Sequence, residues 1–469
     1  MRQPRGVVTE WGMDEKDVII AQLTERIAHL QSENIRLQAE IARLKKNSSN
    51  SSKPPSSDIV KPKTVKTRRR RKRKRGGQRG HRKHVRPAFP PDQIDEVIEY
   101  ELADTADLRA LNEWRIIQQI ELVDRPFVVT EYRARRYRCE RTGKIVTAPL
   151  PPEVVRAGLL GPRLSALVAY HKGACHMSYR TIRTFLRDVV GVSVSTGQLA
   201  KVTHKASGAL AGAYEELAAA LPDEPHVGAD ETGHKDDGRK FWTWCFRPEQ
   251  FTLFKIAGSR GSDVLKAVLG ETFGGVVGCD YFSAYRKYMK DAKAAVQFCL
   301  AHLIREVRFL SEHPDRVLAR WGGKLLGHLR RLFRTLHRGA TMTEAGFARS
   351  MARIRRDFLR QVRRPPPRTE ASTLADRFAK HGDQYFTFLT TPGVEPTNNL
   401  TEQAIRFVVI DRKITQGTRG ERGRRWCERI WTLLATCAQQ RRSAFNFLVE
   451  TITAHWSDQP APSLLPANL

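Results

Sequence analysis

The sequence lacks the features that mark membrane proteins and disulfide-stabilised proteins. No apolar run approaches the ~20 residues that a membrane-spanning helix needs, and the N-terminal segment contains no signal-peptide core. We therefore expect a cytoplasmic, nucleoid-associated protein with no membrane partner. The seven cysteines are scattered, and no two are spaced as C-x-x-C, so we expect neither a disulfide framework nor a zinc ribbon.

Acidic residues are scarce relative to basic ones. The chain has 81 Lys and Arg against 50 Asp and Glu, which gives a formal net charge of +31. A polyanionic partner is the simplest reason for such an excess, and the composition therefore favours binding to double-stranded DNA. A length of 469 residues, of which 40% are hydrophobic, is enough for two to four domains of roughly 150 residues.

Residues 1–46 contain a heptad repeat. Isoleucine occupies one seam position and leucine the other, at Ile20, Ile27, Asn34 and Ile41 and at Leu23, Leu30, Leu37 and Leu44. This pattern predicts a parallel coiled coil that joins the chain into a homodimer or a higher oligomer. Asn34 is expected to fix the register of the paired helices. The alternative is a single amphipathic helix that packs on the core of its own chain.

Residues 47–90 combine a Ser/Pro-rich linker with a cationic tract, and we expect them to be disordered. Fifteen Lys or Arg and no acid lie between Lys61 and Arg86. The densest part consists of Arg68, Arg69, Arg70, Arg71, Lys72, Arg73, Lys74 and Arg75. Such a tract neutralises phosphates but has no base-reading pattern, so we expect non-specific DNA contact. A solvated tail that only aids solubility is the alternative.

Four further regions complete the expected α/β organisation. Short alternating runs predict a small β-rich module over 91–158, and three helical patterns fill 159–222. Ser178 is a good N-cap, and the break at 191–195 resembles the turn of a helix-turn-helix, although helical connectors share that pattern. Residues 223–452 predict a mixed sheet with packed helices and a helical insertion over about 303–390. Residues 453–469 form a C-terminal tail.

Three acidic residues within 223–452 suggest a metal site. Asp230 in HVGADETG and Asp280 in GVVGCDYFSAY end strand-like apolar runs, and Glu402 lies in the first turns of an amphipathic helix. Carboxylates placed this way can converge on Mg²⁺, which prefers oxygen ligands. Taken singly, an Asp at a strand end is more often a turn or cap residue. Since Glu231 adjoins Asp230, strand alternation also leaves open which of the two points inward.

Other residues could support such a site. Helix-cap chemistry precedes Glu402 at Thr397, Asn398 and Asn399, and Asn399 is a candidate supporting residue. Arg406, Arg412 and Lys413 lie on the basic face of the same helix and could meet phosphates. A surface pair between Glu402 and Arg406 is the simpler alternative. His302 in FCLAHLIRE is either a core histidine or a group near the scissile phosphate.

In combination, ADETG, CDYFSAY, AHLIRE and EPTNNLTEQAIRFVVIDRKITQGTRG resemble the bacterial transposases of the insertion sequence 66 family. The resemblance runs from about residue 20 to 450. It implies a ribonuclease-H-like catalytic domain and a DDE triad of Asp230, Asp280 and Glu402 that binds two Mg²⁺ or Mn²⁺ ions. Members often carry a zinc module with two C-x-x-C pairs. Of the four cysteines in those two pairs, this chain has only Cys139, so we expect that the module binds no zinc.

The implied function is metal-dependent cleavage at the ends of an insertion sequence, followed by strand transfer into target DNA. Accessory proteins of the same element are implied as further partners. Two alternatives stay open. One is a catalytically inactive DNA-binding protein derived from a transposase, against which the three intact acids argue. The other is a nuclease of the same fold that cuts DNA without joining strands.

Overall fold

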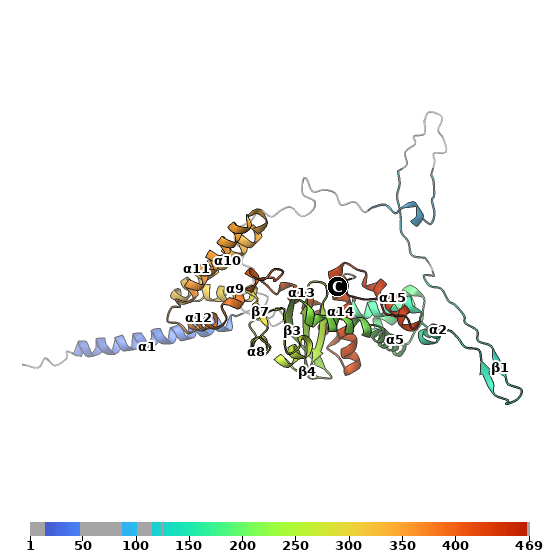
Figure 1. Cartoon of the computed structure of the whole chain (residues 1–469). Coiled ribbons are helices and arrows are strands. Elements are labelled where there is room, and N and C mark those ends of the chain that lie inside the picture. The colour runs from blue at the N-terminus through green and yellow to red at the C-terminus, as the bar shows by residue number, and fades with distance from the viewer. Residues whose placement is uncertain (1–14, 47–86, 101–114, 124, 467–469) are drawn as a thin grey trace, which may run out of the picture.

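The computed structural model describes residues 15–46, 87–100, 115–123 and 125–466. The cationic tract at 61–86 lies outside these residues, as do its cations Arg68, Arg69, Arg70, Arg71, Lys72, Arg73, Lys74 and Arg75. The centre of the molecule is a five-stranded mixed sheet with helices packed around it (Figure 1). This confirms the mixed α/β architecture that the sequence predicts.

The sheet has the strand order β5-β4-β3-β6-β7. Its strands are β3 (His226–Asp236), β4 (Arg239–Arg247), β5 (Leu253–Ala257), β6 (Val276–Cys279) and β7 (Ala295–Phe298). The first three form an antiparallel meander, whereas β6 and β7 run parallel to β3. Asp237 and Gly238 join β3 to β4 with φ values of 50° and 75°. An Asp-Gly pair favours this two-residue turn, because both positions need a positive φ.

Helices connect and cover the strands. They are α7 (Ser262–Leu269) and α8 (Ser283–Asp291) on either side of β6, and α13 (Asn399–Thr415) and α14 (Glu421–Gln440) after the last strand. A helical insertion separates β7 from α13. It contains α9 (Leu300–Ser311), α10 (Arg316–His337), α11 (Glu344–Val362) and α12 (Thr369–His381).

Side chains of α14 bond to backbone N–H groups along the outer edge of β5 and of the residue before it. Thr436, Thr432 and Glu428 accept hydrogen bonds from the backbone N–H groups of residues 252, 254 and 256 at 3.1, 3.0 and 2.7 Å. A helical step of four residues advances about 6.0 Å, close to the advance of two residues along a strand. The spacing of these polar groups therefore matches the strand, and the edge cannot pair with another chain.

A helical unit precedes the sheet in the sequence. It comprises α2 (Pro152–Ala157), α3 (Pro162–Gly173), α4 (Tyr179–Phe185), the π-helical segment Leu186–Val190, α5 (Thr196–Ala209) and α6 (Ala211–Ala220). Ser178 caps α4 by accepting a hydrogen bond from the Thr181 N–H at 3.0 Å, as predicted. The C-terminal helix α15 (Ala444–Trp456) packs on α3 and α5. The expected tail boundary at 453 therefore falls within a helix whose last residue, Trp456, is buried.

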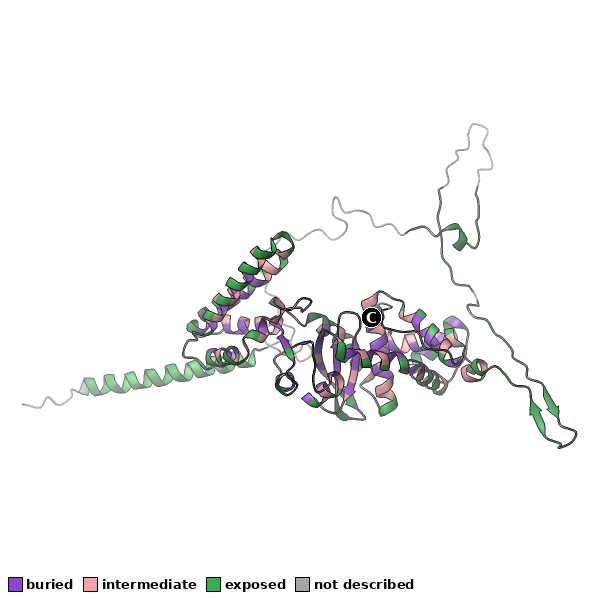
Figure 2. Ribbon diagram, viewed as in Figure 1, coloured by how far each residue is buried: buried purple, intermediate pink, exposed green. Residues whose placement is uncertain are grey.

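Within the described residues of 91–158, extended pairing is limited to one short hairpin. Its strands are β1 (Arg136–Arg138) and β2 (Ile145–Thr147), and both are exposed (Figure 2). A 3₁₀ turn (Pro91–Gln93) and α2 are the other regular elements there. Alternating apolar residues such as Ile117 and Val128 are exposed, so they do not build a core. Cys139 is a free thiol in this region.

Helix α1 (Glu15–Leu44) projects from the body of the protein (Figure 1). Its seam residues are exposed, with Ile20 at 60% and Leu30 at 57% of full accessibility. Among its described residues, the contact with the body is at the C-terminal end, where Ala42 is buried and the ammonium of Lys46, just after the helix, lies 4.3 Å from the centroid of the Phe309 ring. The heptad face therefore does not pack on the core of its own chain. In the described part of the chain, no helix is both long enough and apolar enough to span a membrane.

The far end of the β3–β4 hairpin is held by the loop that joins α13 to α14. Thr418 donates its backbone N–H to the carbonyl of Lys235 at 2.9 Å, and its hydroxyl donates to Asp236 at 2.7 Å. His234 is buried and lies 3.0 Å from the same hydroxyl. Burial, together with nearby arginines, lowers the pKa of His234 to about 4.

This depressed pKa predicts a specific acid sensitivity. Folding disfavours the protonated imidazole of His234, so the native state loses stability as the pH falls below the ordinary value of 6.5 towards 4. We expect His234→Gln to reduce the loss of unfolding free energy between pH 7 and pH 5 by roughly 2 kcal/mol relative to wild type. Urea unfolding at both pH values measures this. The exposed control His204→Gln should follow wild type, and equal losses in all three proteins would contradict the prediction.

Candidate active site

Asp230 on β3 and Asp280, directly after β6, lie at matching positions along neighbouring parallel segments. Gly228 of β3 pairs with Gly278 of β6, and each aspartate lies two residues further along its chain. Asp280 directly follows β6, as predicted. Asp230 does not end its strand, because β3 continues to Asp236 in the hairpin with β4. The sequence interpretation of Asp230 as a strand-end residue is therefore wrong, although its placement opposite Asp280 still brings the two acids to one edge.

Helix α13 carries Glu402 in its first turn and starts against β3. The side-chain amide of Asn398 donates to the carbonyl of Ala229 at 2.8 Å. A Cβ atom on Gly228 would lie only 2.3 Å from the Thr401 hydroxyl, so glycine permits this close approach. Gly228 and Asp230 share a face of the strand, because side chains alternate along it. The start of α13 is thus fixed on the face of β3 that carries Asp230.

The two asparagines before Glu402 have different environments. Asn398 is the N-cap residue of α13, but its side chain forms no capping hydrogen bond and bonds to β3 instead. The prediction of ordinary side-chain capping at this position is therefore wrong. Asn399, the residue chosen from the sequence as a supporting residue, is exposed. The buried amide that positions the helix belongs to Asn398, which is 5% exposed.

The acidic side chains of the site are close enough to one another to influence each other's pKa values. Burial raises the pKa of Asp230 well above its usual range, and the negative charges of Glu231, Asp280 and Glu402 raise it further. Burial also raises the pKa of Asp280. The oxygens of Asp230, Asp280 and Glu402 do not all lie within 4.8 Å of one another. Their convergence on shared metal ions therefore stays a prediction.

Glu231 faces the other side of the sheet and is fully partnered. It accepts hydrogen bonds from the Tyr285 hydroxyl at 2.5 Å and from Arg260 Nε at 2.9 Å. Burial is the main cause that raises the pKa of Glu231, to about 7. Asp230, by contrast, accepts one hydrogen bond, from the backbone N–H of residue 231. The ambiguity between the adjacent acids is thus resolved, with Glu231 directed towards α8 and the β5–α7 loop.

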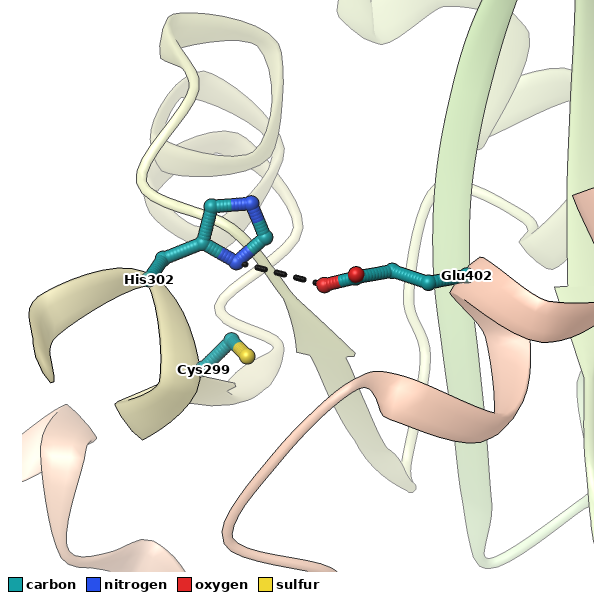
Figure 3. Close-up of side chains that lie close together, drawn as sticks. All are labelled: Cys299, His302 and Glu402. Carbon is teal, nitrogen blue, oxygen red and sulfur yellow. Dashed lines mark ion pairs between the residues drawn. The ribbon is translucent and has the colours of Figure 1, made fainter. Parts of the chain in front are cut away.

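Glu402 faces His302 of α9 (Figure 3) and also lies beside Arg305 of the same helix. Its Oε1 atom lies 3.5 Å from His302 Nδ1 and 3.5 Å from Arg305 Nη2. Burial lowers the pKa of His302 to about 3, so the imidazole is neutral at physiological pH. The simpler alternative, a pair between Glu402 and Arg406, is not among the ion pairs of the described residues. The structure thus places His302 beside Glu402 and adds Arg305 to it.

Cys299 is a neighbour of Glu402 that the sequence analysis did not single out. Among the described residues, only Cys299, His302 and Glu402 bring three potential metal-ligand atoms within 4.8 Å of one another. The spacing Cys-x-x-His, which places both residues on the first turn of a helix, was the available signal. The backbone N–H of Asn398 lies 3.1 Å from Cys299 Sγ, so one residue links α13 to α9 and to β3.

The predicted phosphate-contacting residues of α13 fall into two groups. Arg406 and Lys413 are exposed. Arg412 is half-buried and donates to the Thr232 hydroxyl at 3.0 Å, so part of its role is to attach α13 to β3. Two exposed cations therefore remain on the helix that carries Glu402.

Comparison with known proteins shows the family to which the chain belongs. The family model "Transposase IS66 family" matches residues 157–425, more than half of the chain. The chain belongs to the IS66 transposase family. Its five-stranded mixed sheet is consistent with a ribonuclease-H-like DDE domain, and membership generally implies transposase activity, DNA binding and the use of divalent metal ions. A second model, for a family of unknown function, matches residues 4–87.

Two relatives from Sinorhizobium fredii extend the similarity over most of the chain. The uncharacterized protein y4qI is 25% identical over 418 residues, covering 80% of this chain and 76% of that relative. The uncharacterized protein y4hP is 22% identical over 392 residues, covering 74% and 69% respectively.

The contact between α13 and β3 yields a stability prediction. In Gly228→Ala, the added methyl group would overlap the Thr401 hydroxyl, so the Thr401 side chain or the start of α13 must shift. We expect a loss of about 1–3 kcal/mol in unfolding free energy, as for other overpacked sites. The matched control is Gly233→Ala on the same strand, where the nearest atom lies 4.0 Å away. Denaturant unfolding measures both, and equal stability of the two variants would contradict the close approach.

Proposed function

We propose that the chain is a DDE-type DNA transposase that cleaves the ends of its insertion sequence and joins them to target DNA. The observation that carries this proposal is the placement of Asp230 on β3 and of Asp280 directly after the adjacent, parallel β6, with the start of the Glu402 helix attached to β3. Membership of the IS66 family supplies the reaction class.

The acids of this site fit a pair of hard divalent cations. Asp230 and Asp280 have only hard carboxylate oxygens to offer, and burial is the main reason that their pKa values are raised. Asp230, Asp280 and Glu402 would hold two Mg²⁺ or Mn²⁺ ions. When bound, such ions polarise the phosphodiester and activate water or a 3′-hydroxyl.

The remaining groups of the site orient Glu402 and the DNA. Asn398 holds the start of α13, and the neighbouring His302 and Arg305 limit the rotamers open to the Glu402 carboxylate. Arg406 and Lys413 are exposed on the same helix and suit contacts with phosphates. The cationic tract at 61–86 would add non-specific contacts whose strength falls with salt.

Dimerisation through α1 would allow two element ends to be held together. The support is the exposed heptad seam, which leaves Leu23 and Leu37 at 55% and 50% of full accessibility. Exposed leucines on a long helix are costly in water and are stabilised by a partner helix. Accessory proteins of the same element remain proposed further partners.

Two alternative functions make different predictions. An inactive DNA-binding descendant would bind element ends without cleaving them, and the presence of all three acids argues against it. A nuclease of the same fold would cleave ends without transferring strands. Both would be recognised in a single assay that follows binding, cleavage and joining.

Asp280→Asn tests the catalytic proposal. The change removes a ligand charge but no cation, so Mg²⁺-dependent cleavage of a labelled element end should fall by about a hundredfold or more while DNA affinity stays near wild type. Asp237→Asn, an exposed turn position, is the matched control and should cleave normally. Wild-type cleavage by the Asp280 variant would remove this residue from the site. Binding without cleavage by every protein would favour the inactive descendant.

Leu30→Glu tests the dimer. Replacing this seam residue removes two leucines from the helix pair, which should weaken association by roughly 4 kcal/mol per dimer. His29→Glu adds the same charge one residue away, outside the seam, and should leave association unchanged. Sedimentation velocity of the full chain measures both. Identical behaviour of the two variants would mean that α1 does not dimerise through its heptads.

A further inference from the structure

Cys299, His302 and Glu402 form a compact group of three different donors beside the proposed catalytic acids (Figure 3). A sulfur, a ring nitrogen and a carboxylate oxygen all lie within 4.8 Å of one another. Cys299 is the N-cap residue of α9 and His302 lies in its first turn, whereas Glu402 comes from the first turn of α13. Two helix starts therefore present the three side chains to one small volume.

Two buried polar atoms of this group have no hydrogen-bond partner. His302 Nδ1 and Glu402 Oε1 are both buried, and neither forms a hydrogen bond in the structure. Buried polar atoms are normally satisfied, and each unsatisfied one costs about 1–3 kcal/mol. Cys299 Sγ already accepts the backbone N–H of Asn398 at 3.1 Å. A cation between the three residues would satisfy both open atoms.

The donor set selects the kind of cation. Sulfur, imidazole and carboxylate ligands together suit Zn²⁺, which often takes three protein ligands and leaves a fourth position open. Mg²⁺ prefers oxygen ligands alone. The group thus differs in chemistry from the acids Asp230 and Asp280, although Glu402 belongs to both sets.

We propose that Cys299, His302 and Glu402 bind one Zn²⁺ ion, and that this binding withdraws Glu402 from the catalytic metal site. Binding releases the thiol proton of Cys299 to solvent. The effect is inhibition of the transposase by zinc, a consequence that rests on the proposed function, whereas zinc binding itself does not. The sequence expectation of no zinc considered the paired cysteines of a zinc module and not a site assembled from two helices.

Arg305 gives the proposal a directional test. Its Nη2 atom lies 3.5 Å from Glu402 Oε1, so its charge repels a cation bound there. Its Nε atom is buried and forms no hydrogen bond. Removing this charge should strengthen zinc binding, an effect that misfolding cannot imitate.

The test uses the full chain without DNA and with Co²⁺ as a spectroscopic probe for the zinc site. Wild type should develop a thiolate-to-cobalt charge-transfer band at one equivalent, and Zn²⁺ should abolish the band. Cys299→Ser should lack the band, and His302→Ala should bind at least about tenfold more weakly. The exposed Cys175→Ser is the matched control and should keep the band. Arg305→Gln should bind about tenfold more tightly.

Several results would overturn the proposal. A band of wild-type strength in Cys299→Ser would place the metal on another cysteine, and a missing band in wild type would exclude the site. Weaker or unchanged binding by Arg305→Gln would show that the cation does not lie beside Glu402. Mg²⁺-dependent cleavage of element ends is measured separately, so that failure of the proposed function can be distinguished from failure of the zinc proposal. Zinc binding without cleavage would contradict the proposed function alone, and cleavage without zinc binding would contradict this inference alone.

Discussion

The arrangement of the candidate site depends on the contacts of one buried amide, Asn398. Its side chain donates to the backbone of β3 and its N–H meets the sulfur of Cys299 at the start of α9. Because a buried amide that loses its partners is costly, these contacts fix the start of α13 in position. The Leu300 N–H, which donates to the Pro396 carbonyl at 2.9 Å, joins the same two segments again. Residues more than a hundred positions apart in the chain are thereby held within one site.

The rest of the sheet is held by polar contacts of the same long-range kind. The ladder of Glu428, Thr432 and Thr436 closes the β5 edge, and the loop around Thr418 closes the end of the β3–β4 hairpin. Gly417 makes the second contact possible, since its φ is 98° and a Cβ atom there would lie 2.2 Å from the Lys235 carbonyl. Both contacts come from the segment that follows α13, so the strands and the Glu402 helix are stabilised together.

Local sequence patterns predicted those parts of the site that depend on local structure. Asp280 follows a short apolar run that is a buried strand, and Glu402 lies on a helix with a clear apolar face. Asp230 was misplaced because the residues after it are polar. Glu231, His234 and Asp236 are nevertheless buried in β3, each satisfied by partners that lie elsewhere in the sequence. No local pattern reveals such partners.

The exposed hairpin of 136–147 shows the reverse case. Alternation predicted strands in this region, and the apolar side chains found no second layer to pack against within the described residues. The choice between Asn398 and Asn399 was also beyond local patterns, since both are equally suited to a helix start. Only the position of β3 makes one of them a buried anchor.

The distribution of arginines explains how a strongly basic protein retains an acidic site. Arg260 pairs with Glu231, Arg424 with Asp236 and Arg425 with Glu428, so each of these buried carboxylates has a guanidinium partner. Within the described part of the chain, no ion pair reaches Asp230 or Asp280.

The difference cannot come from a shortage of cations, because the chain carries a net charge of +31. Burying these two carboxylates without an ion-pair partner raises their pKa values and opposes folding, since the charged forms are poorly solvated. An arginine at this position would relieve that cost but would also occupy the place of a metal ion. In the described part of the chain, Glu231 on the same strand has such a partner whereas Asp230 and Asp280 do not, and this difference is the physical reason to expect that divalent cations complete the site.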